Sequence, residues 1–183
     1  SWRNIRNRRA MNPPILIPLP GNEHLAASIA GTIDAEIGAL EIRQFPDGET
    51  GVRIEAPVKG RCVVLAGSLD QPDGKTLPLI FAADAARELG ARQVGLVAPY
   101  LAYMRQDKRF KPGEAVTARS YARLLSASLD FLITVDPHLH RIHSLGEVYN
   151  IRTQVIPAAP LIARWLRSHV ESPLMIGPDK EIE

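Results

Sequence analysis

Residues 62–98, CVVLAGSLDQPDGKTLPLIFAADAARELGARQVGLVA, carry the pattern that decides the fold class. The apolar run at 62–67 is typical of a strand buried on both faces, and 93–98 is a second run of this kind. Between them, residues 75–89 have the length and apolar spacing of a helix that ends before Gly90. A strand, a helix and another strand in this order predict parallel pairing of the two strands.

The same alternation continues in both directions along the chain. Further strands are predicted at 15–18, 131–135 and 153–156, and further helices at 23–35 (capped by Asn22), 117–128 and 161–170 (with Pro160 at its start). Arms at 41–43 and 50–55 form a predicted hairpin, because proline presets φ and glycine accepts positive φ in the turn Pro46-Asp47-Gly48. The fold class is therefore α/β, with a mainly parallel sheet flanked by helices.

Three parts are expected along the chain. Residues 1–10 hold four arginines and no acidic residue, and we interpret them as a leader or an upstream remnant before a natural start at Met11. Residues 11–150 form a first α/β domain. The pattern restarts after residue 150, so residues 151–183 are predicted to begin a second, similar domain, with its next strand at 174–176.

The composition of the chain limits which partners and which cellular compartment are expected. No apolar stretch approaches the roughly 20 residues of a membrane helix, so no membrane partner is expected. Without the four leader arginines the formal net charge of +2 becomes −2, which removes the main argument for nucleic-acid binding. The single cysteine, Cys62, lies in an apolar strand and predicts a buried thiol, no intrachain disulfide and a cytoplasmic protein.

Candidate ligand-binding residues follow the predicted strands, where ligands of open parallel sheets collect. After residues 93–98 comes a long loop with aromatic and basic side chains, which suits a polyphosphate or a nucleobase, although charge alone equally describes a solvated loop. Asp136 and His138 follow the strand at 131–135. With Asp179 they could help to hold a hard divalent cation and phosphate oxygens, the alternative being solvated or helix-capping roles.

The turn at residues 45–49 is a third candidate. Its residues are those of an ordinary hairpin turn, but Phe45 is a large aromatic beside two carboxylates and could meet a base or a neighbouring subunit. The glycine-rich phosphate loop of P-loop enzymes is absent from the sequence, which argues against that class.

Taken in order, five segments resemble the ribose-phosphate pyrophosphokinase (phosphoribosyl pyrophosphate synthetase) family. They are Phe45-Pro46-Asp47-Gly48-Glu49, Pro99-Tyr100 through Arg105-Gln106-Asp107, Glu114-Ala115-Val116-Thr117-Ala118, Asp136-Pro137-His138 and Gly177-Pro178-Asp179. The resemblance implies two domains of phosphoribosyltransferase type, the first of them complete here. It also implies transfer of the diphosphoryl group of ATP to the C1 hydroxyl of ribose 5-phosphate, with Mg²⁺, giving AMP and phosphoribosyl pyrophosphate.

The resemblance also implies roles for single residues. Phe45, Asp47, Gly48 and Glu49 would contact ATP from a neighbouring subunit of a homo-oligomer, so the active site would be shared between subunits. Arg105, Gln106 and Asp107 would bind ATP from the home subunit, with Arg105 stacked on the base. His138 would be catalytic, and the metal positions would be His138, Asp136 and Asp179.

Two departures from the family pattern are Pro137 in place of leucine and Gly177 in place of serine, which suggest a divergent branch. The family's catalytic loop and ribose-phosphate loop would lie beyond residue 183, so residues 1–183 alone are expected to be inactive. A non-catalytic relative that binds nucleotide or an active subunit is the alternative. A phosphoribosyltransferase would require an acidic product-binding loop, which these residues do not provide.

Overall fold

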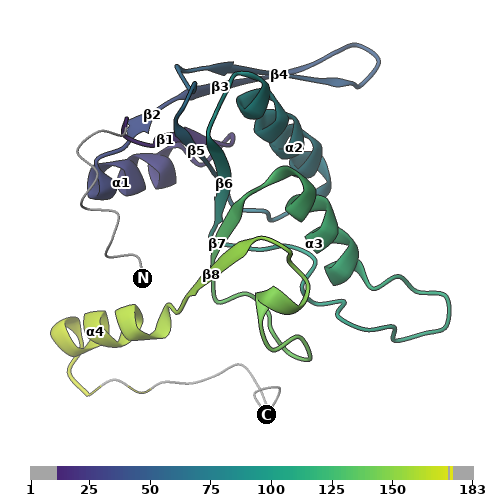
Figure 1. The fold of residues 1–183 in the computed structure, drawn as a ribbon. Helices are drawn as coiled ribbons and strands as arrows, with labels where there is room; N and C mark the ends of the chain where they lie inside the picture. The colour runs from purple at the N-terminus through teal and green to yellow at the C-terminus, as the bar shows by residue number, and fades with distance from the viewer. Residues whose placement is uncertain (1–11, 173, 175–183) are drawn as a thin grey trace.

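Six parallel strands form the central sheet of the computed structural model, which describes residues 12–172 and Leu174 (Figure 1). Their order across the sheet is β2-β1-β5-β6-β7-β8, and each neighbouring pair is parallel. The strands are β1 (Ile15–Pro18), β2 (Glu36–Ile37), β5 (Cys62–Ala66), β6 (Gln93–Ala98), β7 (Phe131–Val135) and β8 (Arg152–Ile156). The predicted α/β class and parallel sheet are confirmed.

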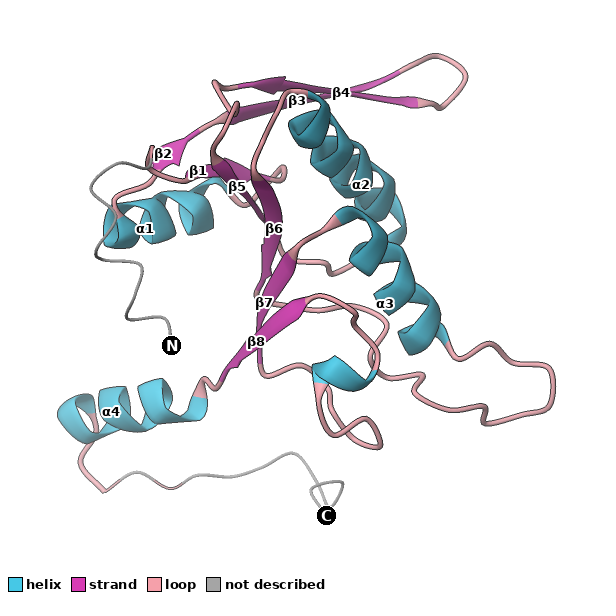
Figure 2. Cartoon of the chain, in the orientation of Figure 1, coloured by secondary structure: helices cyan, strands magenta, loops and turns pink. Residues whose placement is uncertain are grey.

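Helices cover both faces of this sheet. On one side lies α1 (Glu23–Ile33), and on the other lie α2 (Asp73–Glu88) and α3 (Thr117–Ser128), as Figure 2 shows. Alternate residues of β1 enter different cores, because side chains along a strand point to opposite faces. Leu16 packs in the smaller core with Ala26 of α1, whereas Ile15 and Ile17 belong to the larger core.

The hairpin of β3 (Ala39–Gln44) and β4 (Thr50–Glu55) forms a separate two-stranded antiparallel sheet. Its base packs on the larger core, and its tip projects away from the body of the domain (Figure 1). Gly48 has a φ of +91° in the turn, where the Phe45 amide donates to the carbonyl of Glu49 at 2.7 Å. The predicted hairpin is confirmed, although β3 is longer than expected and β2 was missed.

Three local expectations needed correction. Asn22 does not cap α1 with its side chain; its Oδ1 accepts a hydrogen bond from the Ser68 amide at 3.0 Å instead. Helix α1 ends at Ile33 rather than at residue 35, because Asp34 adopts a left-handed φ of 54°. The thiol of Cys62 is half-buried rather than buried, and desolvation raises its pKa despite the opposing charges of nearby arginines.

The segment assigned to a second domain starts inside this sheet. Strand β8 pairs in parallel with β7, with Phe131 opposite Arg152. Helix α4 (Ala159–His169) follows, has Pro160 in its first turn as predicted, and buries none of its residues. The division at residue 150 stays a prediction, and Met175 and Ile176 of the strand predicted at 174–176 lie outside the described residues. No helix in the described part of the chain is long and apolar enough to span a membrane.

Candidate functional site

The loops that follow β5, β6 and β7 lie at one edge of the sheet. Because these strands are parallel neighbours, their carboxyl ends meet there, which is where ligands bind in open α/β sheets. The two longer loops hold candidate residues from the sequence: residues 99–116 after β6, here called the basic loop, and residues 136–151 after β7, here called the histidine loop. The candidate site is therefore the surface formed by these loops.

In the basic loop, consecutive residues face different surroundings. The side chain of Arg105 is exposed and makes no ion pair with the described residues. Gln106 is half-buried against the start of α3: its Oε1 accepts from Thr117 Oγ1 at 3.4 Å, and its carbonyl accepts from the Ala118 amide at 3.3 Å. The hydrogen bonds of Gln106 thus hold the backbone next to Arg105, while the Arg105 side chain is free to contact a ligand.

Asp107 is the buried member of this group, with its side chain 2% exposed. Its Oδ2 accepts from the Arg141 amide and its Oδ1 from Arg141 Nη1, both at 3.1 Å. Burial works against ionisation of Asp107, but the hydrogen bonds and positive charge of Arg141 outweigh it, so the pKa of this carboxyl lies below its usual value. This pair connects the basic loop to the histidine loop.

The start of the basic loop is anchored by Tyr103, whose φ is +59°. Its hydroxyl donates to Asp73 Oδ1 at the start of α2, and this hydrogen bond raises the pKa of Tyr103. The ring lies 4.7 Å from that of Tyr121 in α3, whose hydroxyl is 3.2 Å from Thr76 Oγ1. The loop is therefore fixed to both helices on this face of the sheet.

At the start of the histidine loop, Asp136 has a φ of 36° and accepts from the Ala158 amide at 3.0 Å, which ties the ends of β7 and β8 together. His138 is exposed, and its ring stacks 6.4 Å from that of His140. Between Asn12 and Ser172, the structure gathers no group of three or more metal-ligating side chains. Asp179 lies outside the described residues.

This arrangement fits a cation held only weakly by protein. Mg²⁺ commonly takes one or two side chains and fills its remaining positions with water and substrate phosphates. His138 offers an exposed ring, whereas one carboxylate oxygen of Asp136 is already engaged by Ala158. Two separate side chains fall short of the four close protein ligands of structural zinc, and a cation here would take most of its ligands from water and phosphate oxygens.

The residues of the hairpin tip do not join this site within one chain. Asp47 Oδ1 accepts from the Glu49 amide at 3.1 Å, which shapes the turn. The ring of Phe45 is 39% exposed and lies 4.5 Å below the guanidinium of Arg43. In Figure 1 the tip stands well apart from the basic and histidine loops. The structure thus joins the basic and histidine loops through Asp107 and Arg141, and it leaves the candidates of the turn apart from both loops.

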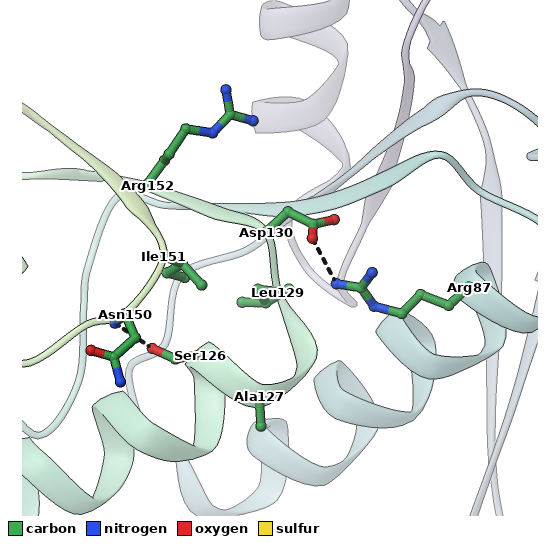
Figure 3. Close-up of a pocket in the computed structure, with 8 residues that line it drawn as sticks. All are labelled: Arg87, Ser126, Ala127, Leu129, Asp130, Asn150, Ile151 and Arg152. Atoms are coloured by element: carbon green, nitrogen blue, oxygen red, sulfur yellow. Dashed lines mark hydrogen bonds and ion pairs between the residues drawn. The ribbon is translucent and has the colours of Figure 1, made fainter.

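Two hollows lie near these elements. The one in Figure 3 is at the opposite, amino-terminal edge of the strands. Two pairs of its polar groups contact each other: Arg87 lies 3.2 Å from Asp130, and Ser126 Oγ accepts from the Asn150 amide. The other adjoins the basic loop. Its charged lining residues are Asp107, Lys108, Arg109, Arg119, Arg123 and Glu147. We call this second one the basic hollow; none of its four cations forms an ion pair with a residue in the described part of the chain.

Sequence reasoning missed several residues of this edge. Arg141 was passed over because its partner is 34 positions away. Asp70 and Lys75 follow β5 and pair at 2.7 Å, and Lys75 also donates to the Ser68 carbonyl. Their position directly after a predicted buried strand was the signal that could have found them.

The fold and its strand-end loops define the chain as a parallel α/β domain with a candidate ligand site at the carboxyl edge of the sheet. It belongs to the ribose-phosphate pyrophosphokinase family: residues 15–128 match the model described as the N-terminal domain of ribose phosphate pyrophosphokinase. The match covers the elements from β1 through α3, including the whole basic loop.

Curated relatives agree with this assignment, and a solved structure shares the fold. The ribose-phosphate pyrophosphokinase of Methanopyrus kandleri is 39% identical over 158 residues, covering 85% of this chain and 53% of that protein. That of Methanothermobacter thermautotrophicus is 35% identical over 167 residues, covering 91% and 57%. The crystal structure of phosphoribosylpyrophosphate synthetase from Mycobacterium smegmatis matches with a TM-score of 0.76 at 22% identity, over 86% of this chain and 53% of that one. The chain spans about half the length of the relatives it matches.

Proposed function

We propose that the complete protein is a ribose-phosphate diphosphokinase. It moves the diphosphoryl group of ATP to the C1 hydroxyl of ribose 5-phosphate and forms AMP and phosphoribosyl pyrophosphate. The observation that carries the proposal is the combination of family membership with exposed Arg105 and His138 on adjoining loops at the carboxyl edge of the sheet. In this proposal residues 11–150 supply the ATP side, residues 151–183 begin a second domain, and the protein works in the cytoplasm.

ATP binding falls to the basic loop in this proposal. Arg105 stacks its planar guanidinium on the adenine, and Gln106, held against α3, supplies polar groups to the nucleotide. The cations of the basic hollow raise the local concentration of a polyphosphate anion before it docks. The expectation that Asp107 contacts ATP directly stays a prediction.

Chemistry in such a transfer depends on positioning and charge more than on covalent steps. The reaction requires the C1 hydroxyl, the β-phosphorus and the leaving oxygen to lie in line, and it builds charge on the phosphate oxygens. In this proposal His138, on the histidine loop, donates a hydrogen bond or a proton to those oxygens. Mg²⁺, held by His138, Asp136 and Asp179 together with the phosphates, would neutralise part of that charge.

The hairpin supports a site shared between subunits of a homo-oligomer. Phe45, Asp47, Gly48 and Glu49 stand on a projecting tip that is remote from the home loops (Figure 1). A turn in this position can reach a nucleotide on a second copy, where Phe45 would lie near the adenine. The half-exposed aromatic ring is consistent with burial against such a partner.

The test uses the full-length protein with ATP, Mg²⁺ and ribose 5-phosphate, and it follows AMP release. We expect turnover by the native protein and a loss of about 10²- to 10⁴-fold on His138→Ala, the usual size of an acid–base or charge-stabilising contribution. The matched control is His143→Ala, an exposed histidine of the same loop, which should retain most of the activity.

The alternative, a non-catalytic relative, gives a different pattern in the same experiment. The native protein would then bind nucleotide or an active subunit without releasing AMP, and His138→Ala would leave complex formation unchanged. Absence of turnover in the full-length protein, together with preserved nucleotide binding, would replace our proposal with that one.

A further inference from the structure

We propose that Asp107 is a positioning residue, which through Arg141 couples the ATP-binding part of the basic loop to the part of the histidine loop that carries His138. The inference rests on the proposed function, since it concerns how the two halves of that site are held in register. It assigns Asp107 a role different from direct contact with ATP.

The spacing along both loops makes this pair a direct connection. Asp107 is two residues after Arg105, and Arg141 is three residues after His138. Both oxygens of the carboxylate are used at 3.1 Å, one by the backbone amide and one by the guanidinium of the same residue. A backbone partner fixes the path of the histidine loop itself, which a side-chain contact alone would not do.

Burial makes the connection stiff. The side chain of Asp107 is 2% exposed, and a buried carboxylate that loses its partner is left uncompensated in a medium of low polarity. The side chain of Arg141 is 44% exposed, so separating the loops costs mainly the two hydrogen bonds that Asp107 accepts. The guanidinium of Arg141 also lies 5.7 Å from the ring centre of Phe110, a second contact with the basic loop.

Direct contact of Asp107 with ATP is disfavoured by the same geometry. Its oxygens are turned to Arg141 and its side chain is 2% exposed, so a ligand could reach them only if the loops moved. A carboxylate facing a triphosphate would also repel it at close range. Arg105, by contrast, is exposed and can meet the nucleotide without any rearrangement.

Coupling of this kind acts in both directions, because energetic linkage between two sites is reciprocal. Nucleotide bound at Arg105 and Gln106 should order the amides of residues 138–144, although these lie on a different loop. A purely structural ion pair would support folding but would not transmit ligand binding from one loop to the other.

The experiment uses the full-length protein and α,β-methylene-ATP with Mg²⁺, an analogue that cannot be cleaved between the α- and β-phosphates. Calorimetry measures its affinity, and hydrogen–deuterium exchange measures protection of residues 138–144 with and without ligand. The variants are Asp107→Asn, which changes the acceptor of both hydrogen bonds, Arg141→Ala, which removes only the guanidinium, and their double mutant. Arg141→Lys keeps the positive charge and should restore part of what Arg141→Ala loses. Asp84→Asn and Arg92→Ala, exposed and far from both loops, are the controls.

We expect Asp107→Asn to weaken the analogue about tenfold, in the usual range of such couplings, and the double mutant to be no weaker than Asp107→Asn. Arg141→Ala keeps the backbone amide that donates to Asp107 Oδ2, so it should weaken the analogue less. At saturating analogue, ligand-induced protection of residues 138–144 should vanish in Asp107→Asn and in the double mutant and fall in Arg141→Ala, and thermal unfolding reports any general loss of fold. An affinity lost on Asp107→Asn while the ligand-induced protection of residues 138–144 stays at the native level indicates direct contact and overturns the inference. If the native protein fails to bind the analogue, the proposed function falls. The loop coupling is then judged by ligand-free exchange: faster exchange of the amides of residues 138–144 in Asp107→Asn supports it, and unchanged exchange refutes it.

Discussion

Replacing Gly95 by alanine should destabilise the sheet beneath the site. Gly95 is buried in β6, the strand that leads into the basic loop, and it lies opposite Phe131 of β7 in the register. A methyl group at this position would overlap the ring of Phe131, which lies directly over the glycine. Either the ring must rotate out of the smaller core or the two strands must separate.

The size of the destabilisation depends on whether the ring rotates or the strands separate. Added volume in a packed core typically costs 1–3 kcal/mol, and Phe131 is only half-buried, so the ring can move toward solvent instead of splitting the strands. We therefore expect a loss of about 2 kcal/mol in the free energy of unfolding. For a domain of this size that corresponds to a fall in Tm of roughly 4–8 °C.

Urea unfolding of Gly95→Ala, Phe131→Ala and the double mutant measures the effect. Removing the ring first should make room, so Gly95→Ala in the Phe131→Ala background should cost less than about 0.5 kcal/mol, a coupling of about 1–2 kcal/mol. Gly31→Ala in α1 is the matched control. Its methyl group would meet nothing within 4 Å, and it should stabilise the helix by about 0.5–1 kcal/mol.

Two outcomes would refute this reasoning. One is a cost of Gly95→Ala below about 0.5 kcal/mol in the native background, which would mean that the ring does not cover the glycine. The other is an equal cost with and without the Phe131 ring, because the destabilisation would then come from the strand itself rather than from this contact.

Three further predictions address the site and its frame. Arg105→Ala should weaken binding of α,β-methylene-ATP to the full-length protein by about 1–2 kcal/mol through lost stacking, measured by calorimetry, whereas Arg92→Ala at the other end of β6 should not. The pKa of Asp107 is lowered by Arg141, so the stability that this pair adds should be complete above the unfolded Asp pKa of about 3.9 and should be lost as pH falls through the lower folded pKa. Urea unfolding between pH 2 and 6 tests this: the free energies of unfolding of wild type and Asp107→Asn should converge at the acid end. Arg61→Ala should lower the free energy of unfolding by about 2–3 kcal/mol, because Arg61 is 6% exposed, donates twice to the Pro13 carbonyl and pairs with Glu36. Arg53→Ala breaks only an exposed ion pair and should lower it by less than about 1 kcal/mol in the same assay.

Local pattern was sufficient to predict most of the fold. The strands β5, β6 and β7 are apolar runs bounded by polar residues, and α3 was predicted at its observed limits because its apolar positions recur at helical spacing. Strand β2 was missed because two exposed residues, Glu36 and Ile37, give no periodicity to detect. Asn22 has the chemistry of a helix cap, but a loop 46 positions away takes its side chain.

Only those parts of the candidate site that follow directly from the local sequence were predictable. Arg105 and His138 follow strands, so their edge of the sheet could be predicted from the sequence. The pairing of Asp107 with Arg141 could not, because it depends on how two loops from neighbouring strands meet. No local signal shows that Asp107 is buried while Arg105, two residues earlier, is exposed.

The central claim is that this site belongs to a diphosphoryl transferase that uses ATP. The most direct measurement incubates the full-length protein with Mg²⁺, ribose 5-phosphate and ATP labelled at the γ-phosphate, and separates the nucleotide and sugar products. We predict AMP as the nucleotide product, in equal amount to a sugar diphosphate that carries all of the label. Formation of ADP with a labelled sugar monophosphoryl group, or release of labelled inorganic phosphate without a sugar product, would contradict the account.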